Sequence, residues 1–263
     1  MSEKVRYETD GAVATITIAR PEVRNAMDVD VFTGLYEAGV RAGADASIRA
    51  VVVAGDGPAF SSGIDVSIFA AGSPDGGPFD PLTVDVSFFQ RSFSVFEEIP
   101  QPTIAAVQGP AFGAGIQLAA ACDLRVAGED ATFCVMETRW GIIPDLGGTQ
   151  RLPRLVGLSR AKDLCFTGRR VDAAEAGEIG LADRVVGAGD HLKAAQELAA
   201  ELAAQPPLAI EGIKRLANAA FDMPVRAGLE REATIQRRVM ASEDFREAVA
   251  ARFEKRTPAY KRR

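Results

Sequence analysis

Two carboxylates stand eight residues apart in a stretch that is otherwise apolar and punctuated by glycine. Glu137 and Asp145 belong to the run ETRWGIIPDLGG, residues 137–148. A carboxyl group in apolar surroundings has a raised pKa because desolvation disfavours its charged form, and a general base or acid that works near neutral pH needs such a shift. The residues alone leave two alternatives open, a helix cap for Asp145 and a surface ion pair with Arg139 for Glu137.

Two glycine-containing turns could bind negative charge. The first covers residues 58–65 (PAFSSGID) and the second covers residues 109–117 (GPAFGAGIQ). Small residues where a strand passes into a helix allow the backbone to approach closely and leave the first helical N–H groups without an acceptor. Such N–H groups attract an anionic oxygen. Glycines after strands also occur in ordinary tight turns, and the second turn lacks both the GK[ST] ending of a phosphate loop and the GxGxxG spacing of a dinucleotide site.

Several other chemistries are disfavoured by the residue types present. The single histidine, His191, lies in a helix-forming run and is expected on a solvated face, which nearly excludes histidine-based catalysis and histidine metal sites. Cys122, Cys134 and Cys165 form no CxxC pair, and reduced thiols in a cytosolic protein are the expectation. A net charge of −6 argues against a nucleic-acid binder, and no apolar run is long enough for a membrane span.

The elements that must position these residues alternate between strand and helix in the first part of the chain. The patterns predict strands at 5–9, 12–19, 50–54, 103–107, 123–127 and 132–135, and helices at 29–42, 83–99 and 115–121. Asp28 is expected to cap the first helix, and the β-branched run 50–54 predicts a strand covered on both faces. Residues 71–81 predict a loop or lid. From residue 147 onward nearly everything predicts helix, including 190–204, 207–221 and 225–255, so we expect an α/β core followed by a helical part.

Taken together, these segments resemble the crotonase superfamily, also called the enoyl-CoA hydratase/isomerase family. The resemblance implies an α/β fold, a crotonase-like spiral of ββα turns with a C-terminal helical region. We place the core at 1–200 and a helical trimerisation region at 201–263. The resemblance also implies an acyl-CoA or enoyl-CoA substrate, of which coenzyme A is a part, and no metal or redox cofactor. It further implies a homotrimer or a hexamer built as a dimer of trimers. The matching segments are RPEVRNAM from Arg20, AFSSGIDVSIF from Ala59, QPTIAAVQGPAFGAG from Gln101, ACDLRVA from Ala121, GIIPDLGGTQRLPRLVG from Gly141, FTGRRVDAAEAGEIGLADRVV from Phe166 and FEKRTPAY from Phe253.

The resemblance also implies roles for individual residues. The amides of Ile64 and Ala114 would stabilise a thioester enolate. Typical hydratases use two glutamates, and this chain has Gln117 at the first position and Glu137 at the second. An amide cannot exchange a proton, so ordinary hydration is disfavoured. Asp145 resembles the catalytic aspartate of the dienoyl-CoA isomerases, which also keep a glutamate eight residues earlier.

Further positions match places where family members contact the substrate. Arg24 and Lys255 fall where basic side chains bind the phosphates or the adenine end of coenzyme A. The aromatic residues Phe69, Phe88 and Phe89 could line the acyl pocket together with Trp140, although aromatics at such spacing are more often part of a core. The full set of predicted binding residues is Arg24, Ser62, Gly63, Asp65, Gly113, Gln117, Trp140 and Lys255.

We therefore predict an enoyl-CoA hydratase/isomerase-type enzyme of fatty-acid metabolism in the cytoplasm. Double-bond isomerisation is favoured over hydration because Gln117 replaces one hydratase glutamate. Three alternatives remain open: a 2-enoyl-CoA hydratase that uses Glu137 alone, a non-catalytic acyl-CoA binder, and an RNA-binding relative. The acidic net charge disfavours the last of these.

Overall fold

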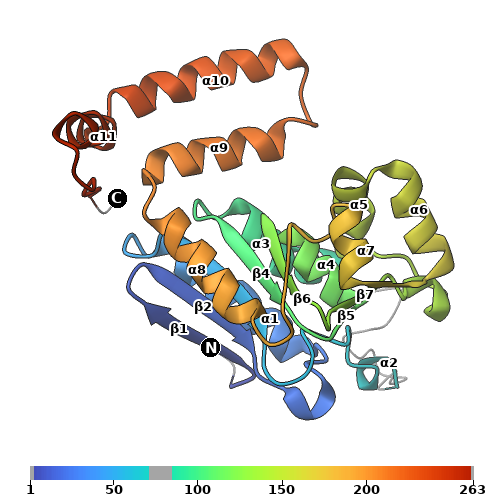
Figure 1. The fold of residues 1–263 in the computed structure, drawn as a ribbon. Coiled ribbons are helices and arrows are strands. Elements are labelled where there is room, and N and C mark those ends of the chain that lie inside the picture. The colour runs from blue at the N-terminus through green and yellow to red at the C-terminus, as the bar shows by residue number, and fades with distance from the viewer. Residues whose placement is uncertain (1–2, 71–84, 262–263) are drawn as a thin grey trace.

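A six-stranded sheet forms the centre of the protein in the computed structural model, which describes residues 3–70 and 85–261 (Figure 1). The strand order is β1-β2-β3-β4-β6-β9. The first pair is antiparallel and the other neighbours are parallel. The strands are β1 (Val5–Asp10), β2 (Val13–Ile18), β3 (Ala50–Gly55), β4 (Thr103–Val107), β6 (Leu124–Gly128) and β9 (Arg184–Val186).

A second, three-stranded sheet stands beside the first and carries one of the predicted turns. Its order is β5-β7-β8, with β5 parallel to β7 and β7 antiparallel to β8. The strands are β5 (Pro110–Phe112), β7 (Thr132–Cys134) and β8 (Arg170–Asp172). Because β5 lies between β4 and the following helix, the second glycine-containing turn is held in a sheet rather than left as a free loop.

The two central strands of the large sheet are buried on both faces, as the run at 50–54 predicts. Val51 and Val53 pack into a core that includes Phe32. Ala50 and Val52 face the opposite side, where α8 (His191–Ala203) supplies a separate apolar cluster. Successive residues of a strand point to opposite faces, so a purely apolar strand serves both cores at once.

Helices cover both faces of the large sheet. Asp28 caps α1 as predicted, because its side chain accepts a hydrogen bond from the N–H of Val31 at 3.1 Å. The helices α1, α3 and α4 pack on one side and α8 on the other (Figure 1). The bounds are α1 (Val29–Ala44), α2 (Ser67–Ala70), α3 (Val86–Glu98), α4 (Ala114–Ala121), α5 (Gly148–Val156), α6 (Leu158–Thr167) and α7 (Ala173–Glu178), with short 3-10 helices η1 (Pro21–Val23) and η2 (Glu137–Trp140).

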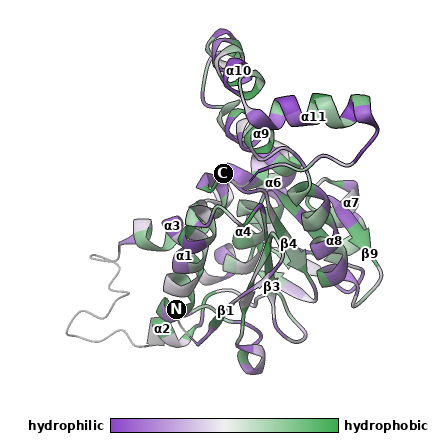
Figure 2. Cartoon of the chain, turned by 90° about the vertical axis from the view of Figure 1, so that its left-hand side faces the viewer, coloured by the Kyte–Doolittle hydropathy of each residue, from purple (hydrophilic) through white to green (hydrophobic). Residues whose placement is uncertain are grey.

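The last three helices project from the α/β part (Figures 1 and 2). They are α9 (Pro207–Ala219), α10 (Val225–Met240) and α11 (Glu243–Glu254). A buried lysine on α9 joins it to the core, since Nζ of Lys214 lies 2.8 Å from Asp123 and donates to the carbonyl oxygens of Phe96 and Gln101 at 2.6 and 2.8 Å. Among the described residues, no helix has both the length and the apolar character needed to cross a membrane.

The structure corrects four expectations. The strands β8 and β9 lie in the part predicted to be almost entirely helical, and the long helix predicted over 225–255 is two helices that meet at Ala241 and Ser242. The turn predicted after Gly109 contains the strand β5. His191 is half-buried at the start of α8 rather than solvated, and burial lowers the pKa of its imidazole.

Two other expectations meet the structure only in part. The loop or lid predicted at 71–81 lies outside the described residues, as do the first two residues of the helix predicted over 83–99. The domain boundary predicted after residue 200 falls inside α8, which packs on the sheet and ends at Ala203. The division of the chain into two parts stays a prediction.

Candidate active site

The first turn leaves one backbone donor without an acceptor. The N–H of Met27 donates to the carbonyl of Gly63 at 2.8 Å, and the N–H of Asp65 donates to the carbonyl of Met27 at 2.9 Å. This parallel bridge uses the groups on either side of Ile64, so in the described chain the N–H of Ile64 itself has no partner. The backbone reaches this arrangement through Gly63, whose φ of +104° is accessible to glycine and strained for other residues.

The second turn presents a similar donor at the start of α4. The N–H of Gly113 donates to the carbonyl of Cys134 at 2.9 Å, which anchors the turn to β7. Ala114 follows as the first residue of the helix, where an N–H group has no acceptor within the helix. Gly113 has φ +53° and ψ −115°, a backbone conformation that only glycine adopts readily.

The two turns lie against each other. Ser61 is bridged to Ala111, with its N–H donating to Pro110 and its carbonyl accepting from Phe112. A Cβ atom placed on Gly63 would lie 3.6 Å from the nitrogen of Ala114 and only 2.9 Å from the carbonyl oxygen of Phe112. The N–H groups of Ile64 and Ala114, unpaired in the described chain, therefore lie on adjacent segments, and such a pair can bind an oxygen that gains negative charge.

Glu137 lies beside this pair of turns. Its side chain is 6% exposed, and its Oε1 is 3.6 Å from the Cβ position of Gly113. Burial raises the pKa of the Glu137 carboxyl, and the negative charge of Asp145 raises it further. The alternative of an ion pair with Arg139 is wrong, because Arg139 turns away and donates to the carbonyl of Gly168 at 2.7 Å.

Asp145 lies in the loop between η2 and α5 and is half-buried. Burial is also the main cause that raises the pKa of its carboxyl. The alternative role as a helix cap is wrong, since Gly147 occupies the cap position of α5 and no side chain caps that helix. The structure thus brings together the two carboxylates that the sequence singles out, both with pKa values raised as a proton-transfer role requires.

Gln117 occupies the space between the two carboxylate segments. Its side chain is buried on α4, and Nε2 donates to Oε1 of Glu137 at 2.6 Å. Oε1 of Gln117 accepts from the N–H groups of Leu146 and Gly148, both at 2.9 Å. The sequence predicts a binding residue here, and the structure finds both ends of the amide hydrogen-bonded to the protein.

Two residues that the sequence analysis missed hold the same loop. Gln90, on α3, donates to the carbonyl of Asp145 at 2.7 Å. Arg151, on α5, donates to the carbonyl of Leu146 at 2.7 Å and forms an ion pair with Glu97. A polar residue within the apolar pattern of a predicted helix was the available signal, but spacing alone does not identify its partner.

The predicted coenzyme A residues near the first turn lie together. The N–H of Ser62 donates to the carbonyl of Arg24 at 2.9 Å, and the side chain of Arg24 is exposed. Asp65 already has partners, because its carboxylate accepts from Ser67 and from Arg20. The hydrogen bond from Ser67 is the main cause that lowers the pKa of Asp65.

Other predicted contacts are more scattered. Lys255 ends α11, which projects away from α2 and the first turn in Figure 1, so one chain does not bring Lys255 to the remaining site residues. Trp140 is 60% exposed. Phe89 belongs to the core, where its ring meets that of Phe32 edge to face at 4.9 Å, and Phe88 packs partly against it. The side chain of Phe69 lies outside the described residues.

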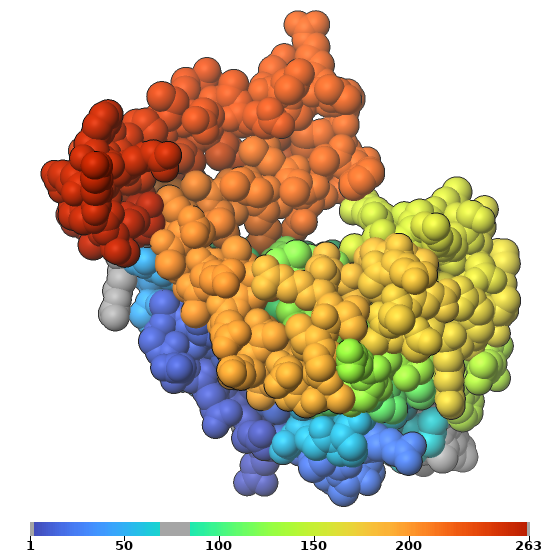
Figure 3. Space-filling model, in the orientation of Figure 1, coloured from blue at the N-terminus to red at the C-terminus, as the bar shows by residue number. Residues whose placement is uncertain are grey.

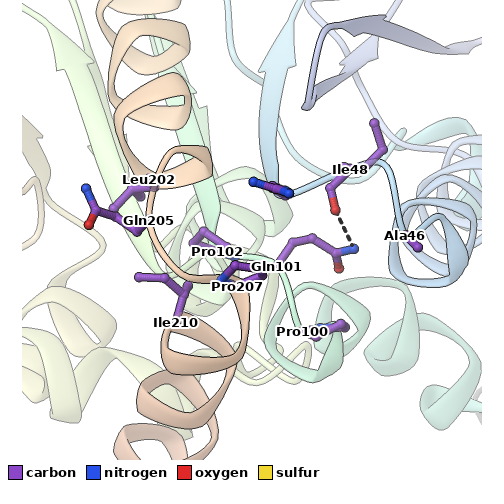
Figure 4. A pocket seen from close by; sticks show the side chains of 10 residues that line it. Ala46, Ile48, Pro100, Gln101, Pro102, Leu202, Gln205, Pro207 and Ile210 are labelled. Atoms are coloured by element: carbon purple, nitrogen blue, oxygen red, sulfur yellow. Dashed lines mark hydrogen bonds between the residues drawn. The ribbon is translucent and has the colours of Figure 1, made fainter. Parts of the chain in front are cut away.

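Two cavities of the described chain lie away from these residues. The one in Figure 4 has a volume of about 10 Å³, room for one water. A larger cavity of about 650 Å³ separates α9 from the core, where the space-filling view is hollowed (Figure 3). Neither contains the two carboxylates or the two N–H groups. The first is lined by Ala46, Ile48, Arg49, Pro100, Gln101, Pro102, Leu202, Gln205, Pro207 and Ile210.

Comparison with known proteins assigns the chain to a family. The family model described as enoyl-CoA hydratase/isomerase matches residues 8–263. The chain is 32% identical to the Delta(3,5)-Delta(2,4)-dienoyl-CoA isomerase, peroxisomal, of Arabidopsis thaliana, over 98% of this chain and 96% of that protein. The crystal structure of an enoyl-CoA hydratase from Bacillus anthracis is 33% identical and superposes with a TM-score of 0.93, covering 99% of this chain and 100% of that one.

A third relative was solved with a ligand bound. A Thermobifida fusca YX protein assigned as an enoyl-CoA hydratase, in complex with acetoacetyl-CoA, is 40% identical with a TM-score of 0.84, covering 90% of this chain and 95% of that chain. The chain therefore belongs to the enoyl-CoA hydratase/isomerase family, within the crotonase superfamily, and is an enzyme of this type.

Proposed function

We propose that this member of the enoyl-CoA hydratase/isomerase family moves a carbon–carbon double bond within an enoyl-CoA thioester. In the proposed reaction, the N–H groups of Ile64 and Ala114 bind the thioester oxygen, on which negative charge develops in the enolate. One carboxylate of the pair Glu137 and Asp145 removes a proton from carbon, and a proton returns at another carbon of the conjugated system. The electrons stay within the substrate, so this chemistry requires neither a metal nor a redox cofactor.

One observation carries the preference for isomerisation over hydration. Two carboxyls have raised pKa values, that of Glu137 beside the paired turns and that of Asp145 in the neighbouring loop, and the amide of Gln117 bridges the two segments. Two proton-transfer groups and no activated water are what a double-bond migration needs. The dienoyl-CoA isomerase among the relatives supports the same choice, and the complex of a relative with acetoacetyl-CoA supports the thioester substrate class.

Hydration with Glu137 alone is the second candidate, and the enoyl-CoA hydratase among the solved structures favours it. The two functions separate in one experiment with purified protein, a panel of acyl- and enoyl-CoA thioesters and deuterated water. Deuterium uptake reports enolate formation, and NMR of the products separates a moved double bond from an added hydroxyl group.

Isomerisation predicts deuterium uptake and double-bond movement that fall about 10²–10⁴-fold in Glu137→Gln and in Asp145→Asn. Rapid hydration of crotonyl-CoA that survives both substitutions would refute the assigned roles. Hydration that is lost only in Glu137→Gln would establish the second candidate. If only the missing acid limits hydration, Gln117→Glu should raise its rate.

We also propose that α9–α11 associate with other copies of the chain in a homotrimer or a hexamer in the cytoplasm. Large apolar residues on these helices and on the turn between α9 and α10 are exposed in the single chain, among them Phe221 at 73%, Val225 at 78% and Phe253 at 85%. Exposed apolar groups in such number mark an interaction surface. Light scattering after gel filtration tests the assembly, and Val225→Asp together with Phe253→Asp should shift it to monomer. A monomeric unsubstituted protein would contradict the proposal.

A further inference from the structure

The side-chain amide of Gln117 has one possible orientation in this site. Its Oε1 accepts from two backbone N–H groups, those of Leu146 and Gly148, and only a carbonyl oxygen can accept there. The NH₂ group must then face Glu137, to which it donates at 2.6 Å. The amide therefore has a fixed direction, with its acceptor toward the Asp145 loop and its donor toward the glutamate.

The two oxygens of Glu137 differ as a consequence. Oε1 accepts the hydrogen bond from Gln117, whereas Oε2 is buried and has no hydrogen-bond partner in the described part of the chain. A buried carboxylate oxygen without a donor is destabilising, and such exceptions in folded proteins call for a functional reason. Oε2 is thus the oxygen of Glu137 that remains free to take up a proton.

The same amide also fixes the second carboxylate segment. Gln90 and Arg151 hold this loop through the carbonyls of Asp145 and Leu146. Their hydrogen bonds reach α3 and α5, whereas those of Gln117 reach both the loop and Glu137. Among these three side chains, Gln117 is therefore the one that hydrogen-bonds to both Glu137 and the Asp145 loop.

We propose that Gln117 is a positioning residue that holds Glu137 against the Asp145 loop and leaves Oε2 of Glu137 as its proton-transferring oxygen. This inference rests on the proposed function, in which Glu137 exchanges protons with the substrate. An amide suits both contacts because it offers an acceptor to the loop and a donor to the glutamate at every pH, whereas a carboxyl group can donate only while it is protonated.

The substitution Gln117→Glu keeps the acceptor toward the Asp145 loop and replaces the donor toward Glu137. Its carboxylate still accepts from Leu146 and Gly148, where the start of α5 favours negative charge. Toward Glu137 it presents a second acceptor in place of the donor, at the 2.6 Å contact. Two carboxylates this close cannot both ionise freely, so the pair retains a proton to higher pH. The titratable groups that interact with Glu137 otherwise stay the same, namely Asp145, Cys134 and Cys165. Arg139 on η2 donates to the carbonyl of Gly168 in both cases.

The test is the pH profile of deuterium exchange into an enoyl-CoA in unsubstituted protein, Gln117→Glu and Gln117→Met. We expect Gln117→Glu to move the acid limb of the profile upward by about one pH unit or more. Gln117→Met fills similar volume without hydrogen bonds and should lower kcat about 10–100-fold, with a smaller change in KM. The control is Gln101→Glu, the same substitution at a buried glutamine away from the site. Nε2 of Gln101 donates to the carbonyl of Ile48, as Figure 4 shows, and to the carbonyl of Ala42. This control should keep the midpoint of the acid limb.

The outcomes separate this inference from the proposed function. Exchange at an unchanged rate in Glu137→Gln refutes the proposed function itself. Exchange that depends on Glu137, with an acid limb in Gln117→Glu that matches the unsubstituted protein, overturns the inference alone. A second readout uses the unsubstituted protein and so does not depend on whether a variant folds. The NMR resonances of the Nε2 protons of Gln117 should shift with pH, with the same midpoint as the acid limb of the exchange profile. Resonances that do not respond across that midpoint also overturn it.

Discussion

Oε1 of Glu137 lies 3.6 Å from the place that a Cβ atom would take on Gly113, the residue immediately before the unpaired N–H of Ala114. The carboxylate and the start of α4 therefore share one small volume. The N–H of Ile64 borders the same volume, because Gly63 packs against Ala114. A thioester whose oxygen meets these amides would have its acidic carbon within reach of the carboxylate.

Replacing Ala114 with proline should remove one donor and keep the fold. Proline is favoured at the first position of a helix, and the N–H lost there has no partner in the described chain. We expect Ala114→Pro to lower the rate of deuterium exchange by about 10²–10³, with a melting temperature close to that of the unsubstituted protein. The control is Leu158→Pro, which also follows a glycine as the first residue of a helix. It should keep full activity, and an equal loss in both variants would contradict the role of the Ala114 amide.

A methyl group at position 63 should disrupt the contact between the two turns. Its carbon would lie 2.9 Å from the carbonyl oxygen of Phe112, and the φ of +104° strains any residue other than glycine. We expect Gly63→Ala to destabilise the protein by about 1–3 kcal/mol and to abolish exchange. Gly11→Ala is the matched control, with φ +55° but no atom within 4 Å of the new carbon. That variant should show the strain in its unfolding free energy and retain activity.

Glu137→Gln should stabilise the protein at neutral pH while it inactivates the enzyme. Because burial raises the pKa of Glu137 above its ordinary value of 4.5, the folded state holds this proton more tightly than the unfolded state. Stability therefore decreases as the pH rises from 4.5 through the raised pKa, and above it the ionised group is destabilising.

The gain from Glu137→Gln should be about 1–3 kcal/mol at pH 8 and should vanish near pH 4, in urea unfolding at both pH values. Glu8→Gln, at an exposed position of β1, serves as the control and should change neither value. A gain in Glu137→Gln that is the same at pH 4 and pH 8 would contradict the burial effect.

The buried ammonium group of Lys214 should be the main polar anchor of α9. Substitution by methionine, whose unbranched side chain is one atom shorter, leaves Asp123 and two carbonyl oxygens without this donor. We expect a loss of about 3–5 kcal/mol in the free energy of unfolding. Lys193→Met removes a lysine whose side chain is 78% exposed and whose partner is Glu197 at 3.9 Å. A difference of less than 1 kcal/mol between the two variants would contradict this anchor.

The local part of the fold follows from sequence patterns. Asp28 caps α1, and the apolar run at 50–54 becomes a strand buried on both faces, because these signals lie within a few neighbouring residues. The strands β8 and β9 are three residues each, too short for an alternating pattern. They exist because partners distant in sequence pair with them, and Arg125, which donates to Asp183 and to the carbonyl of Leu181, fixes β9 at the edge.

The candidate site divides in the same way. Glu137, Asp145 and the two turns could be singled out because their residue types and spacing carry the signal. The partner of Glu137 could not, since an ion pair with the nearby Arg139 fits the sequence as well as a hydrogen bond from Gln117 on another helix. Which side-chain oxygen remains free depends on the direction of one amide, and no sequence pattern encodes that direction.

The two isolated bridges, Met27 with Ile64 and Ser61 with Ala111, have a consequence for the energetics of turnover. They fix both donor-bearing turns by backbone pairing before any thioester arrives, and the side chains of Asn25 and Ser61 add hydrogen bonds in the first turn. The N–H dipoles of the two turns are thus already oriented in the folded protein. Little energy is then needed to reorient them during the proposed reaction. In the proposed reaction, stabilisation of the enolate would therefore come from the main chain, and side-chain substitutions around it would leave the two donors in place.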